Sequence, residues 1–147
     1  MQLSTSHLSE HVEVIDALIT TAAGSSDANG NTIDMADAFG CMFILKLGTI
    51  TDTAVGGLKV QQSEDDSTWA DIASATQAHA TTGDSNKVII IDVRRPAITM
   101  RYVRAVVERA TANSEIDQVM AIKYQMAGSV VQGTNASTTV IGTVNVP

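Results

Sequence analysis

The fold is decided by residues 48–72, which read GTITDTAVGGLKVQQSEDDSTWADI. Within this stretch, residues 58–62 (LKVQQ) alternate in polarity, and a period of two is typical of a strand with one buried face. Residues 63–68 have short polar side chains that can hydrogen-bond the backbone and hold a turn. Trp69 follows directly, and we expect it to be a buried structural anchor beneath this turn.

A second strand is expected in MRYVRAVV, residues 100–107. Alternation places Val103, Ala105 and Val107 on one face together with Arg101, and this face is the better candidate for the core. The same reasoning predicts further strands at residues 11–21, 32–35, 41–47, 88–93 and 118–125.

Some segments leave alternatives open. Residues 11–21 and 118–125 also present apolar side chains at helical spacing, although alternation favours a strand in both. Residues 88–93 (VIIIDV) are apolar on both faces, which predicts a central strand covered on each side. Residues 22–31 and 71–86 are rich in small and polar side chains, and we expect exposed loops there.

Short strands separated by turn signals about every ten residues favour an all-β fold. We predict a single-domain antiparallel β-sandwich or jelly-roll-like barrel with extended N- and C-terminal arms. Residues 1–12 would form the N-terminal arm and residues 13–126 the sandwich. Residues 127–147 would be a C-terminal arm or the last strand.

Composition and charge exclude several classes of protein. Only 3% of the residues are aromatic, so a core must be filled by aliphatic side chains and methionine. No apolar run approaches the roughly 20 residues of a membrane helix, and the N-terminus does not read as a signal peptide. We therefore expect a soluble protein with no membrane partner. The net charge of −7 opposes general attraction to phosphate backbones, so no nucleic-acid partner is expected.

No metal or cofactor site is predicted. Residues 27–31 (DANGN) superficially resemble a calcium loop, but the glycine is one place early and Ala38 stands where the bidentate glutamate belongs. His7, His11 and His79 are widely separated and lie in no ligand-spaced motif.

No catalytic residues are predicted either, so we do not expect an enzyme. The acidic residues at 64–71 have no evident catalytic partner and fit a solvated turn. The serines lack a nucleophile elbow, and Gly56-Gly57 lacks the lysine of a phosphate loop. Cys41 is the only cysteine, and its apolar neighbours predict a small buried residue in a reducing compartment.

The strand at 58–62, the acidic turn, Trp69 and the later RYVR strand at 101–104 together resemble small virion proteins of tailed bacteriophages. These are head decoration, capsid-stabilising or minor structural proteins, and the similarity runs from about residue 33 to residue 124. The resemblance implies a decoration or cement protein on the outer capsid surface, assembled in the host cytoplasm. Its implied partners are the major capsid protein and further copies of itself, a trimer among the options.

Candidate interface residues come from the tail and from one arginine pair. Residues 127–147 carry no charged side chain, and the near-alternating stretch 139–146 could add a strand to an edge. That edge could belong to its own domain or to a neighbouring subunit, and a disordered tail is the third alternative. The candidates are Thr139, Val140, Ile141, Val144 and Val146, with Arg94 and Arg95 as positive charges able to meet an acidic shell.

Two other functions remain alternatives. The first is a tail, neck or head-fibre component of the virion. The second is a host-attachment β-sandwich that binds carbohydrate, for which exposed aromatic rings would be needed.

Overall fold

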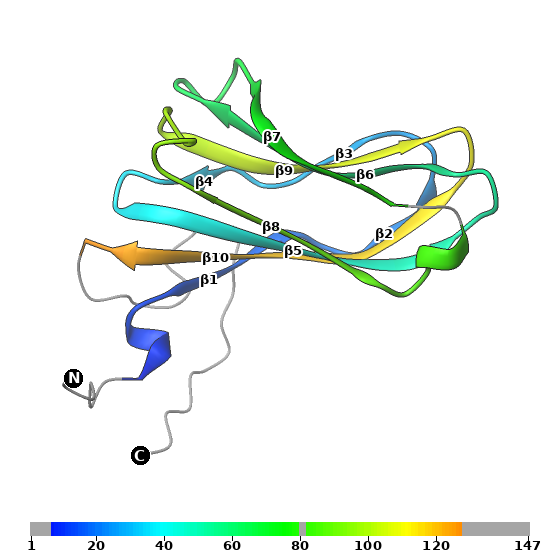
Figure 1. Cartoon of the computed structure of the whole chain (residues 1–147), viewed down its shortest axis with the longest axis horizontal. Helices are drawn as coiled ribbons and strands as arrows, with labels where there is room; N and C mark the ends of the chain where they lie inside the picture. Colours follow the sequence, from blue (N-terminus) through cyan, green and yellow to red (C-terminus); the bar gives the residue numbers. More distant parts are fainter. Residues whose placement is uncertain (1–6, 80–81, 128–147) are drawn as a thin grey trace.

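The chain folds into two packed antiparallel sheets, as Figure 1 shows. The structure is a computed structural model that describes residues 7–79 and 82–127. Its strands are β1 (Glu13–Leu18), β2 (Thr21–Gly24), β3 (Ala28–Asn29), β4 (Ile33–Asp34), β5 (Ala38–Ile50), β6 (Val55–Ser63), β7 (Ala70–His79), β8 (Val88–Arg94), β9 (Tyr102–Ala110) and β10 (Ser114–Met126). The short 3₁₀ helices are η1 (Leu8–Glu10) and η2 (Thr82–Asp84). Sheet A has the order β1-β10-β5-β8 with β2 also beside β10, and sheet B has the order β3-β9-β6-β7 with β4 also beside β9.

The hydrophobic core lies between the two sheets. Sheet A contributes Ile15, Phe43 and Leu45, and sheet B contributes Leu58 and Val103, all with 0% exposure. Along each central strand these residues alternate with outward-facing ones, as the pleat requires. The prediction of an all-β antiparallel sandwich is therefore confirmed.

The alternation read from residues 100–107 is also confirmed within β9. Val103, Ala105 and Val107 all face the core and are almost fully buried. Arg101 does not join them, because it precedes the strand and is exposed. The segments that also fitted a helix are the strands β1 and β10, which pair with each other in sheet A. Their residues Ile15, Ala17, Val119 and Ala121 are buried in the core between the sheets.

The interpretation of residues 88–93 as a central strand is wrong. β8 is an edge strand that pairs with β5, and Ile89, Ile91 and Val93 face the core. Val88 and Ile90 point away from it and are 51% and 59% exposed. A strand that is apolar on both faces can be covered on both sides or be left with one apolar face outside, and composition does not distinguish the two.

The two predicted loops contain strands. Much of residues 71–86 is β7, an edge strand whose Ile72 and Ala75 are buried while most of its other side chains are exposed. Its register with β6 shifts between Lys59 and Gln61, so the apolar residues do not alternate and the pattern is hidden in the sequence. Residues 22–31 likewise include most of β2 and all of β3, which are too short to show a period.

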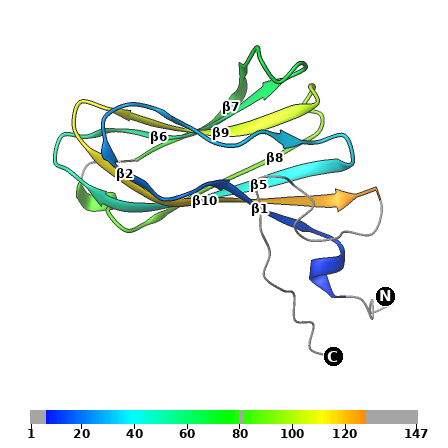
Figure 2. The same ribbon diagram turned by 180° about the vertical axis from the view of Figure 1, so that it is seen from behind.

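The two long sides of the sandwich differ. After β2 the chain crosses from sheet A to sheet B on the side seen in Figure 2. There the Gly30 N–H donates to the Ala105 carbonyl at 2.8 Å, and the Asn31 N–H donates to the Ala17 carbonyl at 2.7 Å. A Cβ on Gly30 would lie 2.7 Å from that Ala17 oxygen, so only glycine fits this close crossing. On the opposite side, the edge strands β7 and β8 belong to different sheets and do not pair.

Candidate interaction surfaces

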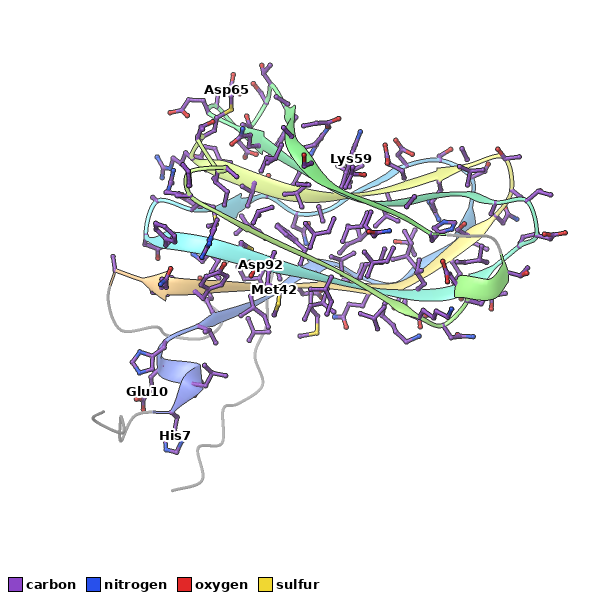
Figure 3. The ribbon with its side chains drawn as sticks, viewed as in Figure 1. His7, Glu10, Met42, Lys59, Asp65 and Asp92 are labelled. Atoms are coloured by element: carbon purple, nitrogen blue, oxygen red, sulfur yellow. The ribbon has the colours of Figure 1, made fainter. Side chains whose placement is uncertain are left out.

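The outer face of sheet A carries an apolar patch that runs across its strands. The register places Val14, Ile122 and Met42 in one row, and Met120, Ile44 and Ile90 in the next. We call this set, completed by Val88, the apolar face: Val14, Met42, Ile44, Val88, Ile90, Met120 and Ile122. Figure 3 shows Met42 on the side of sheet A that is turned away from sheet B. All seven residues are half-buried or exposed in the folded chain, and such a patch usually marks a contact site.

Polar groups at the margin of the apolar face are paired with one another. Lys46 lies 3.5 Å from Asp117, and the Tyr124 hydroxyl donates a 2.7 Å hydrogen bond to Asp92. Burial, followed by this hydrogen bond, raises the pKa of Tyr124 to about 12. The charges around the patch are thus partly neutralised by contacts within the chain, which favours apolar rather than ionic docking here.

The outer face of sheet B is polar and internally bonded. Lys59 (Figure 3) bridges Asp71 at 3.4 Å and Glu108 at 3.2 Å, which links all three of the strands β7, β6 and β9. Gln61 donates to Asp71 at 2.7 Å and accepts from Arg104 at 2.7 Å. The hydrogen bond to Glu108 raises the pKa of Lys59, and the bond from Gln61 lowers the pKa of Asp71. These side chains hold one another in their charged forms, as a solvated structural network does.

Trp69 differs from the expected buried anchor. It is half-buried and does not belong to the hydrophobic core. The Arg104 guanidinium lies over its ring, 4.2 Å from the centroid, in cation–π geometry. The tryptophan therefore packs on the outer face of sheet B, and one face of its ring is already occupied.

The acidic turn is held by one carboxylate, that of Asp65. It accepts hydrogen bonds from the backbone N–H groups of Thr68 at 2.8 Å and Ser67 at 2.9 Å, and from the Ser63 hydroxyl at 3.0 Å. These bonds hold the pKa of Asp65 far below its usual range. Figure 3 shows Asp65 at the tip of this turn, beyond sheet B. The predicted polar turn is present, and its central acid stabilises the loop.

A groove follows the open side of the sandwich between β7 and β8. One hollow of about 500 Å³ is lined by residues 72–75 of β7 and 91–94 of β8, and extends to Pro96 and Ala97. A second hollow of about 260 Å³ continues along residues 77–78 and 87–90. Both hollows follow the same two strand edges, and we call this pair of hollows the groove.

The predicted interface residues are distributed unevenly. Arg94 is exposed at the end of β8 and lines the larger hollow of the groove. Arg95 is half-buried, and its guanidinium donates to the carbonyls of Ile98 and Met35 at 3.2 and 3.4 Å, which is a structural role. Thr139, Val140, Ile141, Val144 and Val146 lie outside the described residues.

Sequence reasoning missed a buried ion cluster at one end of the core. Lys123 is 5% exposed and contacts Glu13 at 2.8 Å and Asp37 at 3.0 Å. Burial acts to lower the pKa of Lys123, but the hydrogen bonds to Glu13 and Asp37 outweigh it and the pKa is raised. A signal was present, because Lys123 alternates with Val119 and Ala121 and so shares with them the face of the strand that is turned to the core.

Arg109 was also missed as a structural residue. It is 8% exposed, and its guanidinium donates to the carbonyls of Ser26, Ala22 and Ser114 at 2.7, 3.0 and 3.1 Å. Asp27, the first residue of the calcium-like stretch, accepts the Arg109 backbone N–H at 3.0 Å. This acid therefore fixes the approach of a loop to β9.

Several other features bear on chemistry. Cys41 is buried, and burial raises the pKa of its thiol, so the cysteine is a core residue as predicted. Across residues 7–79 and 82–127, no three His, Cys, Asp or Glu side chains gather closely enough to hold a metal ion. None of the helical segments in this part of the chain has the length and hydrophobicity of a membrane span.

Comparison with known proteins identifies the fold and no sequence family. No protein-family model matches the sequence, and no curated protein matches it significantly. The solved structure of the PBSX exported protein XepA aligns at a TM-score of 0.55 and 14% identity, covering 96% of this chain and 46% of XepA. This chain thus spans less than half the length of XepA, and at this identity the likeness extends to the fold alone.

Two weaker likenesses carry no argument. The SPBc2 prophage-derived protein YomS aligns at a TM-score of 0.47 and 12% identity, covering 83% of this chain and 98% of YomS. A chain from infectious bursal disease virus, Gt strain, aligns at 0.48 and 13% identity, covering 77% of this chain and 31% of the viral chain.

Proposed function

We propose that this protein is a structural component of a tailed-bacteriophage virion, a decoration or cement protein that binds the outside of the head. Its partner would be the major capsid protein, and it would stabilise contacts between capsid subunits after assembly in the host cytoplasm. The sequence resemblance to virion proteins supports this role, and XepA shows that a prophage protein can have this fold.

The observation that carries the proposal is the apolar face of sheet A. This face is apolar in the middle, and the charged groups at its margin are paired within the chain. Exposing apolar surface to water is unfavourable by roughly 25 cal/mol for each square ångström, so covering the face with a partner would be favourable. Docking on a shell subunit would cover Ile90 and Met42 together, because they lie in adjacent rows of the same face.

Repetition would make such a contact durable. A shell offers the same site many times, and linked copies of a binding module gain apparent affinity without any new contact. A homo-oligomer of this chain would present the apolar face several times in one particle. Modest affinity per site is then sufficient for lasting attachment.

A pair of matched substitutions tests the docking face. Ile90→Lys places a charge on the apolar face, and Val55→Lys places the same charge on sheet B, at residues that are 59% and 57% exposed. Because the ammonium must be desolvated on docking, we expect Ile90→Lys to weaken binding to purified capsids at least about tenfold. Val55→Lys should bind like the unmodified protein. Sedimentation of capsids with bound protein measures both.

Two further observations complete this test. Both variants should keep the circular dichroism spectrum and melting temperature of the parent, because neither side chain is buried. Equal capsid binding by both variants would exclude the apolar face as the contact. Copy number in purified particles separates the alternatives, since hundreds of copies indicate the head and a few indicate a tail, neck or fibre position.

A further inference from the structure

The buried ion cluster at one end of the core brings an amine and two carboxylates into contact. The Lys123 Nζ lies 2.8 Å from Glu13 Oε2 and 3.0 Å from Asp37 Oδ1. The same nitrogen donates to the Asp34 carbonyl at 3.2 Å. The side chains of Lys123 and Glu13 are only 6% and 4% exposed. Three acceptors thus hold the nitrogen of a lysine that is almost completely removed from water.

We propose that this cluster modifies itself covalently: the Lys123 amine and the Asp37 carboxyl group condense to an amide with loss of one water molecule, and Glu13 transfers the proton. The chain supplies all of the reacting groups, so no further reagent is consumed. The new bond would link β10 to the turn that precedes β5. The proposal does not depend on the virion role, and its test needs no capsid.

The fold places the reacting groups through backbone contacts. Glu13 is directly opposite Lys123 in the register of β1 and β10. The Asp37 carbonyl accepts the Ala127 N–H at 2.8 Å, which holds the turn before β5 beside the end of β10. Groups that are held in contact react without the entropic cost of finding each other. The carboxyl carbon of Asp37 is one bond beyond the oxygen that the nitrogen contacts, so attack requires little movement.

Burial favours the condensation. Charges that are removed from water are costly, and their mutual attraction does not always compensate for this cost. The reaction replaces an ammonium and a carboxylate by one neutral amide. Burial acts to lower the pKa of Lys123, but the hydrogen bonds to Glu13 and Asp37 raise it overall, so the ammonium form predominates before the reaction. The neutral amine must therefore arise by proton transfer within the cluster, and we expect a slow reaction.

The reaction balances within three side chains. The Lys123 ammonium first gives one proton to the Asp37 carboxylate, which produces a neutral amine and a carboxylic acid. The amine lone pair then bonds to the carboxyl carbon, and the C=O π pair moves onto its oxygen. Glu13 accepts a second proton from the nitrogen and delivers it to the hydroxyl group. When the C=O bond re-forms, the C–O bond to this hydroxyl breaks and water leaves.

The surroundings of the cluster suit these transfers. Glu13 and Asp37 contact the same nitrogen, so the transferred proton has a short distance to travel. The Asp37 side chain is 56% exposed, which gives the departing water a path to solvent. One N–H remains on the nitrogen of the product and can donate to Glu13, so this buried carboxylate keeps a hydrogen-bond donor.

Lys59 is a matched lysine that should not react. It also lies between two carboxylates, 3.4 Å from Asp71 and 3.2 Å from Glu108. Those two acids are 59% and 40% exposed, and Lys59 itself is 20% exposed. Water solvates these charges, so their neutralisation gains little. The burial of Lys123 together with Glu13 distinguishes the reactive cluster from this surface network.

Mass spectrometry of the intact, denatured full-length protein tests the proposal. The protein is kept near neutral pH after purification until its mass no longer changes. We expect it to become lighter by one water molecule, and peptide mapping should find a branched peptide that joins Asp37 to Lys123. The variant Lys59→Arg should lose the same mass. A chain that keeps its full mass overturns the proposal without any variant of the cluster.

Two variants of the cluster test the roles of its members. Lys123→Arg keeps the positive charge but lacks the reactive amine, and it should keep its full mass. Glu13→Gln keeps the size of the side chain but cannot carry a proton, so loss of water should slow at least about tenfold. Circular dichroism verifies that each variant is folded. Loss of water by Glu13→Gln at the rate of the unmodified protein would overturn the role of Glu13.

A succinimide at Asp37 would produce the same change in mass without Lys123. It would form by attack of the Ala38 backbone nitrogen, so it would persist in Lys123→Arg and would reopen in mildly alkaline solution. The lysine amide should be absent from Lys123→Arg and should survive the alkaline treatment. Equal loss of water by Lys123→Arg and the unmodified protein would therefore overturn the proposal.

Discussion

Several charged side chains in this protein hold local structure. Asp65 anchors the turn before Trp69, Arg109 ties three carbonyls together, and Lys123 neutralises two acids at one end of the core. Each of these residues is charged, so composition alone assigns it to the surface. Their contacts are long-range in sequence or depend on the backbone path of a turn, and therefore appear only in the folded chain.

The Asp65 carboxylate should make stability depend on pH. Its pKa is lowered by backbone and hydroxyl hydrogen bonds, so its contribution is present above the unfolded value of about 4 and is lost as the pH falls through the lowered pKa. Asp65→Asn should therefore lower the urea midpoint at pH 7. The difference from the unmodified protein should shrink progressively below about pH 4.

Glu64 provides the control for this titration. It is an exposed neighbour in the same turn, and Glu64→Gln removes the same charge without removing the hydrogen bonds to Asp65. Its urea midpoint should change little at either pH. A loss in Asp65→Asn that is as large at pH 3 as at pH 7 would mean that the carboxylate charge is not what stabilises the turn.

The position of Trp69 changes what its removal should cost. A half-buried ring stacked against Arg104 contributes partial apolar burial and one cation–π contact, so Trp69→Ala should cost about 1 to 2 kcal/mol. Phe43 is fully buried, and Phe43→Ala should cost about 3 to 5 kcal/mol. Urea denaturation of the two variants measures both values, and equal losses would restore the interpretation of Trp69 as a core anchor.

At the scale of strands, the sequence predicted the central elements and misjudged the edges. β9 is buried on one face along its whole length, so its alternation is visible at residues 103–107. β7 touches the core only at a few small or branched side chains interrupted by a bulge, and it therefore resembles a loop. β8 has two apolar faces because one packs on the core and the other belongs to the apolar face.

The candidate surfaces could be predicted only in part. Arg94 was chosen for its charge, and it does lie exposed beside the groove. The apolar face was not foreseen, because it joins residues from four strands whose order in sheet A differs from their order in the sequence. A surface of that kind follows from topology and register, which a single sequence does not state.

For the molecule as a whole, the attachment to capsids should be insensitive to salt. The chain has a net charge of −7, and the proposed contact is apolar with paired charges at its margin. Apolar burial depends little on screening, whereas contacts between exposed charges weaken as the Debye length falls from about 10 Å at 0.1 M salt to about 3 Å at 1 M. Binding to purified capsids should persist over this range.

A salt titration of preformed complexes measures this directly. Arg94→Gln is the matched variant, because it removes the exposed arginine beside the groove and leaves the apolar face unchanged. Its binding should equal that of the unmodified protein at every salt concentration. Release of most of the protein below 1 M salt, together with weakened binding of Arg94→Gln at low salt, would show that ionic contacts hold it.

Because of the crossing at Gly30, the two long sides of the sandwich should differ in their resistance to separation of the sheets. Backbone hydrogen bonds connect the two sheets along one long side, where the N–H groups of Gly30 and Asn31 donate to the carbonyls of Ala105 and Ala17. Along the other side, β7 and β8 meet without hydrogen bonds between them. Under mechanical load or heating, we expect the sheets to separate first beside β7 and β8, while the crossing at Gly30 still holds them together and acts as a hinge. Resistance to a pulling force should therefore depend on the direction in which the force is applied.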